Sequence, residues 1–247
     1  MTAARDFCGG LPPGVVQVHL RDLSLLEETD AVLSLPERRR AAGFLNTVAR
    51  ERFVKSRTVL RRLLGEHLGL RPDDVPIRLE AGGKPQLGPP YSQVNFNLSH
   101  AEHLCLFALV RGHAVGADLE QVRERPGLNG VSARLFGPEE HKALLETPAG
   151  DFNAAFYRTW TRREAVLKAL GLGLSVAPAE VSVPVSAASG PWSLKSGGVL
   201  QTSWLTSDLE GVPGFCAALA VLGGAGLSVR VVSSSYVALT ATPLTRK

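Results

Sequence analysis

The stretch Trp160-Thr161-Arg162-Arg163-Glu164-Ala165-Val166-Leu167-Lys168 decides the fold when it is read together with Asp118-Leu119-Glu120. If the first stretch is helical, Trp160, Glu164 and Lys168 share one face, because residues four apart are neighbours on a helix. If the second stretch is extended, Asp118 and Glu120 point to the same side. The two stretches therefore predict three carboxylates beside an ammonium group, which is typical of a site for a hard divalent cation.

Composition indicates a folded globular protein. The chain has 247 residues, of which 45% are hydrophobic, enough for one large domain or two small ones. The first ten residues contain no apolar run typical of a signal peptide, and no later window is apolar enough for a membrane span. We therefore expect a cytoplasmic protein with no membrane partner. Cys105 and Cys216 lie in apolar runs and are expected to be buried, whereas Cys8 has no pairing or ligand spacing.

The charge of the chain allows an anionic partner without choosing one. A formal net charge of +4 fits a nucleic acid, a polyphosphate cofactor or an acidic protein. The aromatic content is 6%, and aromatic residues do not alternate with basic ones as in single-strand binding modules. The composition therefore argues against a nucleic-acid-binding module.

The first part of the chain predicts strands and two helices. A helix is expected to begin at Leu35-Pro36-Glu37, with Phe44, Leu45 and Val48 as its apolar stripe. A longer helix is expected from about Ala49 to Leu68, with Gly69 ending it. Strands are predicted at residues 15–20, 75–79, 95–100, 104–110 and 114–119. The turn at residues 111–113 predicts a hairpin between the last two.

The second part repeats this layout. Helices are expected to begin at Pro138 and after Asp151, the latter ending near Gly171, and strands are expected at residues 181–185 and 215–221. In both parts a long helix is followed by strands, which predicts two similar α+β halves, residues 1–113 and 114–247, with a ligand cleft between them.

Two further motifs could carry function, although each is common as ordinary structure. Gly82-Gly83-Lys84-Pro85 is a stiff turn that presents a lysine, and Ser99-His100 places a hydroxyl and an imidazole at a strand end. The chain has no Walker loop, GxGxxG, nucleophile elbow or His/Cys metal cluster.

Taken together and in order, these motifs resemble a known family. The series is Gly83-Lys84-Pro85, Phe96-Asn97-Leu98-Ser99-His100, Val115-Gly116-Ala117-Asp118-Leu119-Glu120 and residues 156–174. Over roughly residues 35 to 220 it is similar to the signatures of surfactin-type 4′-phosphopantetheinyl transferases. The resemblance implies a Mg²⁺-dependent, monomeric enzyme with two halves related by a pseudo-twofold axis and an active site between them. It would transfer the phosphopantetheine arm of coenzyme A to a serine of an apo acyl, polyketide or peptidyl carrier protein, releasing adenosine 3′,5′-bisphosphate.

The resemblance also implies a role for each matching residue. Asp118, Glu120 and Glu164 would bind Mg²⁺, Glu164 would also take the serine proton, directly or through water, and Lys168 would stabilise the leaving phosphate. Lys84 and Pro85 would border the adenine, Ser99, His100, Arg38 and Arg52 would hold the 3′-phosphate, and Arg163 would contact the pyrophosphate. Residues 128–136 are the expected carrier docking surface, with the alternative that their apolar residues belong to the core.

This chain departs from the family pattern at two positions. Arg163 replaces the usual lysine, which keeps the charge and changes its shape, and Ala101 replaces the usual serine or threonine after the histidine. The main rival reading is a metal-dependent phosphoesterase or nucleotidyl transferase that uses the same carboxylates and needs no carrier protein.

Overall fold

The computed structural model describes residues 10–80, 83–172, 180–186, 189–196, 199–223, 226–233 and 240–241. Cys8, Gly82 and residues 173–174, which entered the motifs above, lie outside this part. The helices are α1 (Leu35–Ala42), α2 (Thr47–Leu68), α3 (Leu128–Leu135), α4 (Pro138–Leu145) and α5 (Phe152–Leu170). The strands are β1 (Val15–Asp22), β2 (Ile77–Leu79), β3 (Pro85–Leu87), β4 (Val94–Ala101), β5 (Leu104–Arg111), β6 (Val115–Gln121), β7 (Val181–Ser182), β8 (Ser189–Ser196), β9 (Val199–Glu210), β10 (Phe215–Leu222), β11 (Ser228–Ser233) and β12 (Thr240–Ala241). The predicted α+β class is confirmed.

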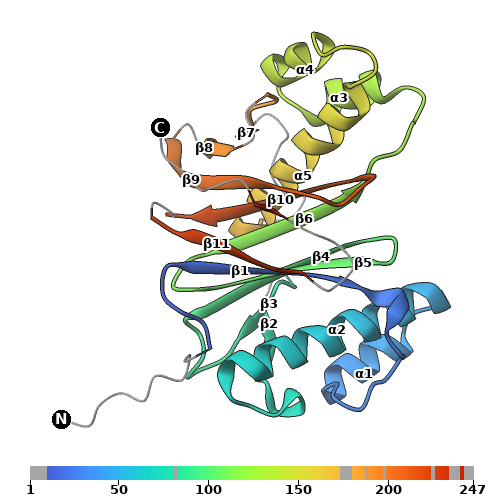
Figure 1. Ribbon diagram of the computed structural model, residues 1–247, viewed down its shortest axis with the longest axis vertical. Helices are drawn as coiled ribbons and strands as arrows, with labels where there is room; N and C mark the ends of the chain where they lie inside the picture. The colour runs from blue at the N-terminus through green and yellow to red at the C-terminus, as the bar shows by residue number, and fades with distance from the viewer. Residues whose placement is uncertain are drawn as a thin grey trace.

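Two sheets pack face to face in the middle of the molecule. One has the order β11-β1-β5-β4, and the other has the order β6-β10-β9-β8-β7 with β12 paired to β9. Their inner faces share one apolar core, in which Val18 and Leu106 of the first sheet join Ala117 and Leu219 of the second. Figure 1 shows the two sheets stacked between α2 on one side and α5 on the other.

Each outer layer is a long helix that buries an apolar stripe on its sheet. In α2, Leu60 and Leu64 pack against Phe107 of β5, on the face of the sheet away from the central core. The Asn46 side chain caps the start of α2, and Gly69 ends it in the left-handed region at φ 66°. α5 covers the second sheet in the same way, with Val166 packed in a cluster with the small residues of β10.

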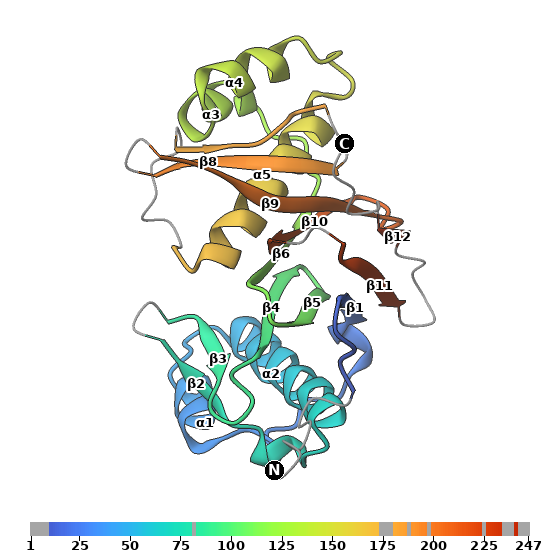
Figure 2. The same ribbon diagram turned by 90° about the vertical axis from the view of Figure 1, so that its left-hand side faces the viewer.

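The strand connections repeat between the two halves, which Figure 2 shows one above the other. β1 pairs with β5 and β5 with β4, all antiparallel, while β6 pairs with β10 and β10 with β9 in the same sense. In each half, a long helix follows the first of these strands in the sequence and precedes the other two. This helix is α2 after β1 and α5 after β6. One strand crosses between the halves, because β11 pairs in parallel with β1. The division at residues 113 and 114 stays a prediction.

Two local predictions were wrong. α1 ends at Ala42, and Leu45 and Val48 are 103% and 60% exposed, so the expected apolar stripe does not face the core. β5 and β6 do not form a hairpin, because β6 pairs with β10 in the other sheet. The turn at residues 111–113 instead carries the chain from one sheet to the other. No helix in the described part combines the length and apolar character needed to cross a membrane.

Close packing of α5 on β6 brings the predicted site together. A Cβ atom added at Gly116 of β6 would lie 2.0 Å from the carbonyl oxygen of Ala165 and 2.5 Å from the amide of Ala169, both in α5. Only glycine permits this approach. The helix can therefore lie directly on the strand, and the side chains that follow on each element converge.

Candidate active site

A cavity of about 380 Å³ lies where the two halves meet. Its lining combines first-half residues of α2, β3 and β4 with second-half residues of β6 and α5. Seven of the predicted site residues line it, namely Pro85, Ser99, His100, Asp118, Glu120, Glu164 and Lys168. We call it the carboxylate cavity. The fold therefore gathers these seven residues from both halves around one cavity.

Lys168 and Asp118 form the charged centre of this cavity. The Lys168 Nζ lies 2.5 Å from Asp118 Oδ1 and 3.0 Å from the Ser99 hydroxyl oxygen, and that hydroxyl donates to Asp118 Oδ1 at 2.9 Å. The Asp118 side chain is 4% exposed and that of Lys168 is 29% exposed. The buried carboxylate is thus held by partners from β4 and α5, while the ammonium group keeps access to the cavity.

Glu120 and Glu164 form, together with Asp118, one acidic wall of the carboxylate cavity. Burial raises the pKa of Glu164, and repulsion from Asp118 raises it further. The same two causes raise the pKa of Glu120, whose Oε1 accepts a 3.4 Å hydrogen bond from the Trp160 indole. Three neighbouring carboxylates in a partly buried wall favour binding of a cation.

Two carboxylate oxygens in this wall fit a Mg²⁺ ion. Asp118 Oδ2 and Glu164 Oε1 are buried, and neither has a hydrogen-bond partner within the described residues. Those residues contain no group of three or more His, Cys, Asp or Glu side chains arranged to hold a metal ion. Mg²⁺ often needs only one or two carboxylates, since substrate phosphates and water complete its shell. Binding of one ion by Asp118, Glu120 and Glu164 together stays a prediction.

Three other predicted residues lie outside the carboxylate cavity. The Arg38 guanidinium donates to the carbonyl oxygens of Leu33 and Ala31, next to the start of α1. Arg52 lines a neighbouring cavity. The Lys84 ammonium donates to the carbonyl oxygens of Lys168 and Ala169, at 2.7 and 3.0 Å. Lys84 therefore caps the C-terminal end of the helix that carries Lys168.

Arg163 also lies outside the lining of the carboxylate cavity. Its guanidinium is buried, lies 3.3 Å from Glu140 Oε2, and donates to the carbonyl oxygens of Leu135 and Val181. Its Cζ stands 5.1 Å from the centre of the Phe136 ring. Successive helical residues point about 100° apart, so Arg163 and Glu164 face different surroundings. Arg163 joins α5 to the α3–α4 segment and is not among the residues that line the carboxylate cavity, so its contact with the pyrophosphate stays a prediction.

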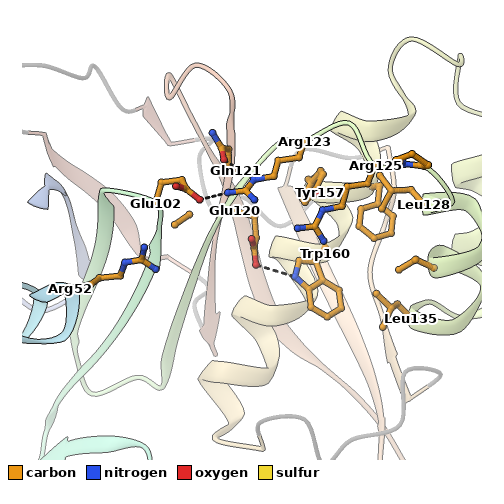
Figure 3. Close-up of a pocket in the computed structure, with 14 residues that line it drawn as sticks. Arg52, Glu102, Glu120, Gln121, Arg123, Arg125, Leu128, Leu135, Tyr157 and Trp160 are labelled. Carbon is orange, nitrogen blue, oxygen red and sulfur yellow. Dashed lines mark hydrogen bonds and ion pairs between the residues drawn. The ribbon is translucent and has the colours of Figure 1, made fainter. Parts of the chain in front are cut away.

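A second cavity, of about 440 Å³, adjoins the first and is drawn in Figure 3. The two cavities share Glu120 and Trp160. Arg52 lies on one side of it, and Leu128 and Leu135 of α3 lie on the other. A ligand bound at the carboxylates thus has an adjoining space with apolar residues on the α3 side.

Sequence reasoning missed Arg57, which lines the carboxylate cavity from α2. A signal was available, because Arg57 falls on the apolar stripe of α2 between Phe53 and Leu60, at helical spacing. A charged residue at a core position needs a partner.

A comparison with known families matches the part of the chain that carries the carboxylates. Residues 114–220 match the 4′-phosphopantetheinyl transferase superfamily. The matched segment is less than half of the chain, and it contains Asp118, Glu120, Glu164 and Lys168.

Individual relatives point the same way. The chain is 38% identical over 154 residues to 4′-phosphopantetheinyl transferase HetI of Nostoc sp., an alignment that covers 62% of this chain and 65% of that protein. It is 28% identical over 161 residues to 4′-phosphopantetheinyl transferase Sfp of Bacillus subtilis, covering 60% of this chain and 69% of the relative. The chain thus spans about two thirds of the length of these relatives. The crystal structure of Thermotoga maritima holo-[acyl-carrier-protein] synthase aligns over 44% of this chain and 62% of the other, at 23% identity and a TM-score of 0.29.

Proposed function

We propose that this protein is a 4′-phosphopantetheinyl transferase. It transfers the phosphopantetheine arm of coenzyme A to a serine hydroxyl of an apo carrier protein and releases adenosine 3′,5′-bisphosphate. The observation that carries the proposal is that Asp118, Glu120, Glu164 and Lys168 line one cavity and lie within the segment that matches the family. An acidic wall with one ammonium group suits a pyrophosphate that arrives with a divalent cation.

The cavity residues have distinct tasks in this reaction. Asp118, Glu120 and Glu164 would hold Mg²⁺, which neutralises charge on the coenzyme A pyrophosphate when it is bound. Lys168 keeps its ammonium group between Ser99 and Asp118, where it faces the developing charge on the leaving phosphate. Pro85, Ser99 and His100 line the first-half side and orient the nucleotide portion.

Proton transfer falls to Glu164. The serine oxygen attacks the β-phosphorus, the bond from that phosphorus to the oxygen of the adenosine-bearing phosphate breaks, and the hydroxyl proton passes to a Glu164 carboxylate oxygen. Burial and the charge of Asp118 raise the pKa of Glu164, which makes its carboxylate a better proton acceptor.

The second cavity and helix α3 suit the remaining parts of the substrates. The arm that extends from the pyrophosphate would enter the space beyond Glu120 and Trp160. The carrier protein would dock at residues 128–136, where Val131 is 40% exposed. Carrier proteins of this kind are acidic, so the formal charge of +4 favours their encounter with the enzyme. We further propose a monomer in the cytoplasm.

The decisive test is the mass of the acceptor. The protein is incubated with coenzyme A, Mg²⁺ and a panel of apo carrier proteins, and intact-mass spectrometry should detect one added phosphopantetheine on at least one carrier. Omitting Mg²⁺ or substituting Glu164→Gln should suppress this gain. Absence of any gain across the panel would contradict the proposal. Turnover of nucleotides or phosphoesters without a carrier would instead support the phosphoesterase reading.

A further inference from the structure

Lys84 joins the first half of the molecule to the last turn of α5. It stands immediately before β3, and its Nζ donates to the carbonyl oxygen of Lys168 at 2.7 Å and to that of Ala169 at 3.0 Å. In Figure 2 this end of α5 faces the β2–β3 hairpin. A side chain from one half therefore holds the backbone of the other.

The chemistry of the contact favours a fixed arrangement. The last carbonyl groups of a helix have no partners within the helix, and they carry its partial negative charge, so an ammonium group satisfies both needs. Burial lowers the pKa of Lys84, and the charge of Glu80 opposes that shift. Two of the three N–H groups of Lys84 are used by the carbonyls. The side chain is thus committed to α5.

Lys168 is held at both of its ends. Its carbonyl oxygen accepts from Lys84, while its own Nζ lies 2.5 Å from Asp118 Oδ1 and 3.0 Å from the Ser99 hydroxyl oxygen. The backbone contact fixes where the side chain starts, and the side-chain contacts fix where it ends. The position of the ammonium group of Lys168 in the carboxylate cavity therefore depends on Lys84.

The same contact sets the spacing of the two sides of the carboxylate cavity. Pro85, which follows Lys84 in the chain, lines the cavity from the first half, and Lys168 lines it from the second. On the second-half side, the backbone of Ala169 packs directly on Gly116 of β6. The last turn of α5 is therefore fixed both to its own sheet and, through Lys84, to the hairpin that carries Pro85.

We propose that Lys84 is a positioning residue for the transfer reaction. Its ammonium group holds the last turn of α5 against the first half, so that Lys168 meets the leaving phosphate. This inference rests on the proposed function. The task differs from the adenine contact that the family resemblance implies for Lys84, because Lys84 acts through Lys168 and touches no reacting atom. A displacement of about 1 Å at a reacting group can lower a rate by roughly a hundred-fold, so such support has a large effect.

Steady-state kinetics separate positioning from nucleotide binding. Lys84→Met should lower kcat for carrier modification by roughly ten-fold or more and leave KM for coenzyme A within about two-fold. A contact with adenine would instead raise KM at unchanged kcat, and that result would overturn the inference. Lys84→Arg keeps a charged donor and should recover part of kcat, even if Lys84→Met fails to fold. Arg62→Met removes an exposed cation of the first half and should change neither constant.

A double-variant cycle separates positioning from a merely structural role. Lys168→Met removes the group that Lys84 positions, so adding Lys84→Met to it should lower the residual rate by less than about two-fold. A structural role would lower the rate by the same factor in the wild-type and the Lys168→Met backgrounds. Full additivity of the two substitutions would therefore refute the proposal.

Hydrogen exchange tests the contact without any transfer. The amides of Gly171 and Leu172 donate to carbonyl oxygens of the last turns of α5 at 3.2 Å each. Lys84→Met should speed the exchange of these amides by roughly ten-fold, and Arg62→Met should not. Unchanged exchange in Lys84→Met would overturn the inference whether or not the protein is a transferase. A wild type that modifies no carrier would contradict the proposed function instead.

Discussion

Lys168 Nζ lies 2.5 Å from Asp118 Oδ1, and this ion pair joins helix α5 to strand β6 at the centre of the carboxylate cavity. The pair keeps the ammonium group of Lys168 aimed at Asp118 and Ser99. Two of the residues to which we assign chemistry are therefore coupled before any substrate arrives. Changing one of them should disturb the position of the other.

The first prediction concerns that pair. Asp118→Asn removes one negative charge from the wall and the counter-charge of Lys168, so the rate of carrier modification should fall by roughly a hundred-fold or more. Initial rates measured by intact mass, with thermal unfolding as a check on folding, test this. Asp73→Asn alters an exposed aspartate that pairs with Arg71 and should leave the rate unchanged. A rate within two-fold of wild type for Asp118→Asn would exclude Asp118 from the chemistry.

The second prediction concerns the contact of α5 with β6. Gly116→Ala places a methyl group on the carbonyl oxygen of Ala165, so helix and strand must separate, at a cost of about 2–4 kcal/mol in the free energy of unfolding. Urea denaturation measures the loss. Gly130→Ala is the matched control, because nothing lies within 4 Å of the added Cβ in α3, and it should be neutral or stabilising. Equal stability of the two variants would argue against the close contact.

The third prediction tests whether Arg163 stabilises the fold or binds the pyrophosphate of coenzyme A. Arg163→Met leaves Glu140 buried without its cation, which should lower the free energy of unfolding by about 2–4 kcal/mol. KM for coenzyme A should stay within two-fold, since Arg163 contacts α3, α4 and β7 rather than the cavity. The double variant Arg163→Met with Glu140→Gln should recover part of the stability. A raised KM with unchanged stability would restore the pyrophosphate role that the family resemblance implied.

Sequence reasoning succeeded where a single local cause decides the structure. Gly69 and Gly171 end helices because each takes the left-handed conformation. β5 was recognisable because it is apolar on both faces, and the structure buries it between α2 and the second sheet. The acid pair at Asp118 and Glu120 follows from the period of a strand.

Sequence reasoning failed where the outcome depends on partners distant in the chain. The segment that became β6 could pair with β5 or β10, because both offer apolar strands of similar length, and its own residues do not choose. Arg163 is adjacent to Glu164 in sequence, yet it finds Glu140 on another helix. The sequence does not distinguish Arg57 from the other basic residues of its helix, whereas in the structure Arg57 lines two cavities.

The fourth prediction concerns pH and His19. Burial lowers the pKa of His19 from 6.5 to about 4, helped by Arg21 and His67. The unfolded chain therefore takes up a proton below pH 6.5, and the folded protein does so only near pH 4. His19 thus contributes stability that is present above pH 6.5 and lost as the pH falls toward 4, on the order of 3 kcal/mol.

Urea midpoints measured between pH 7 and pH 4 check this prediction, with His19→Gln as the reference. The wild type should lose more stability than the variant over that window, because glutamine does not titrate. Parallel curves for the two proteins would mean that His19 contributes nothing to acid sensitivity.

The pairing of β11 with β1 has a consequence for how the chain acquires its structure during synthesis. Val15 lies opposite Ser228, so this edge of β1 has no strand beside it until the segment that forms β11, more than 200 residues later, has left the ribosome. Contacts between residues so distant in sequence form slowly, and an open strand edge can recruit other chains in the meantime. The protein is therefore most exposed to aggregation and to capture by chaperones while its first half has been synthesised and β11 has not.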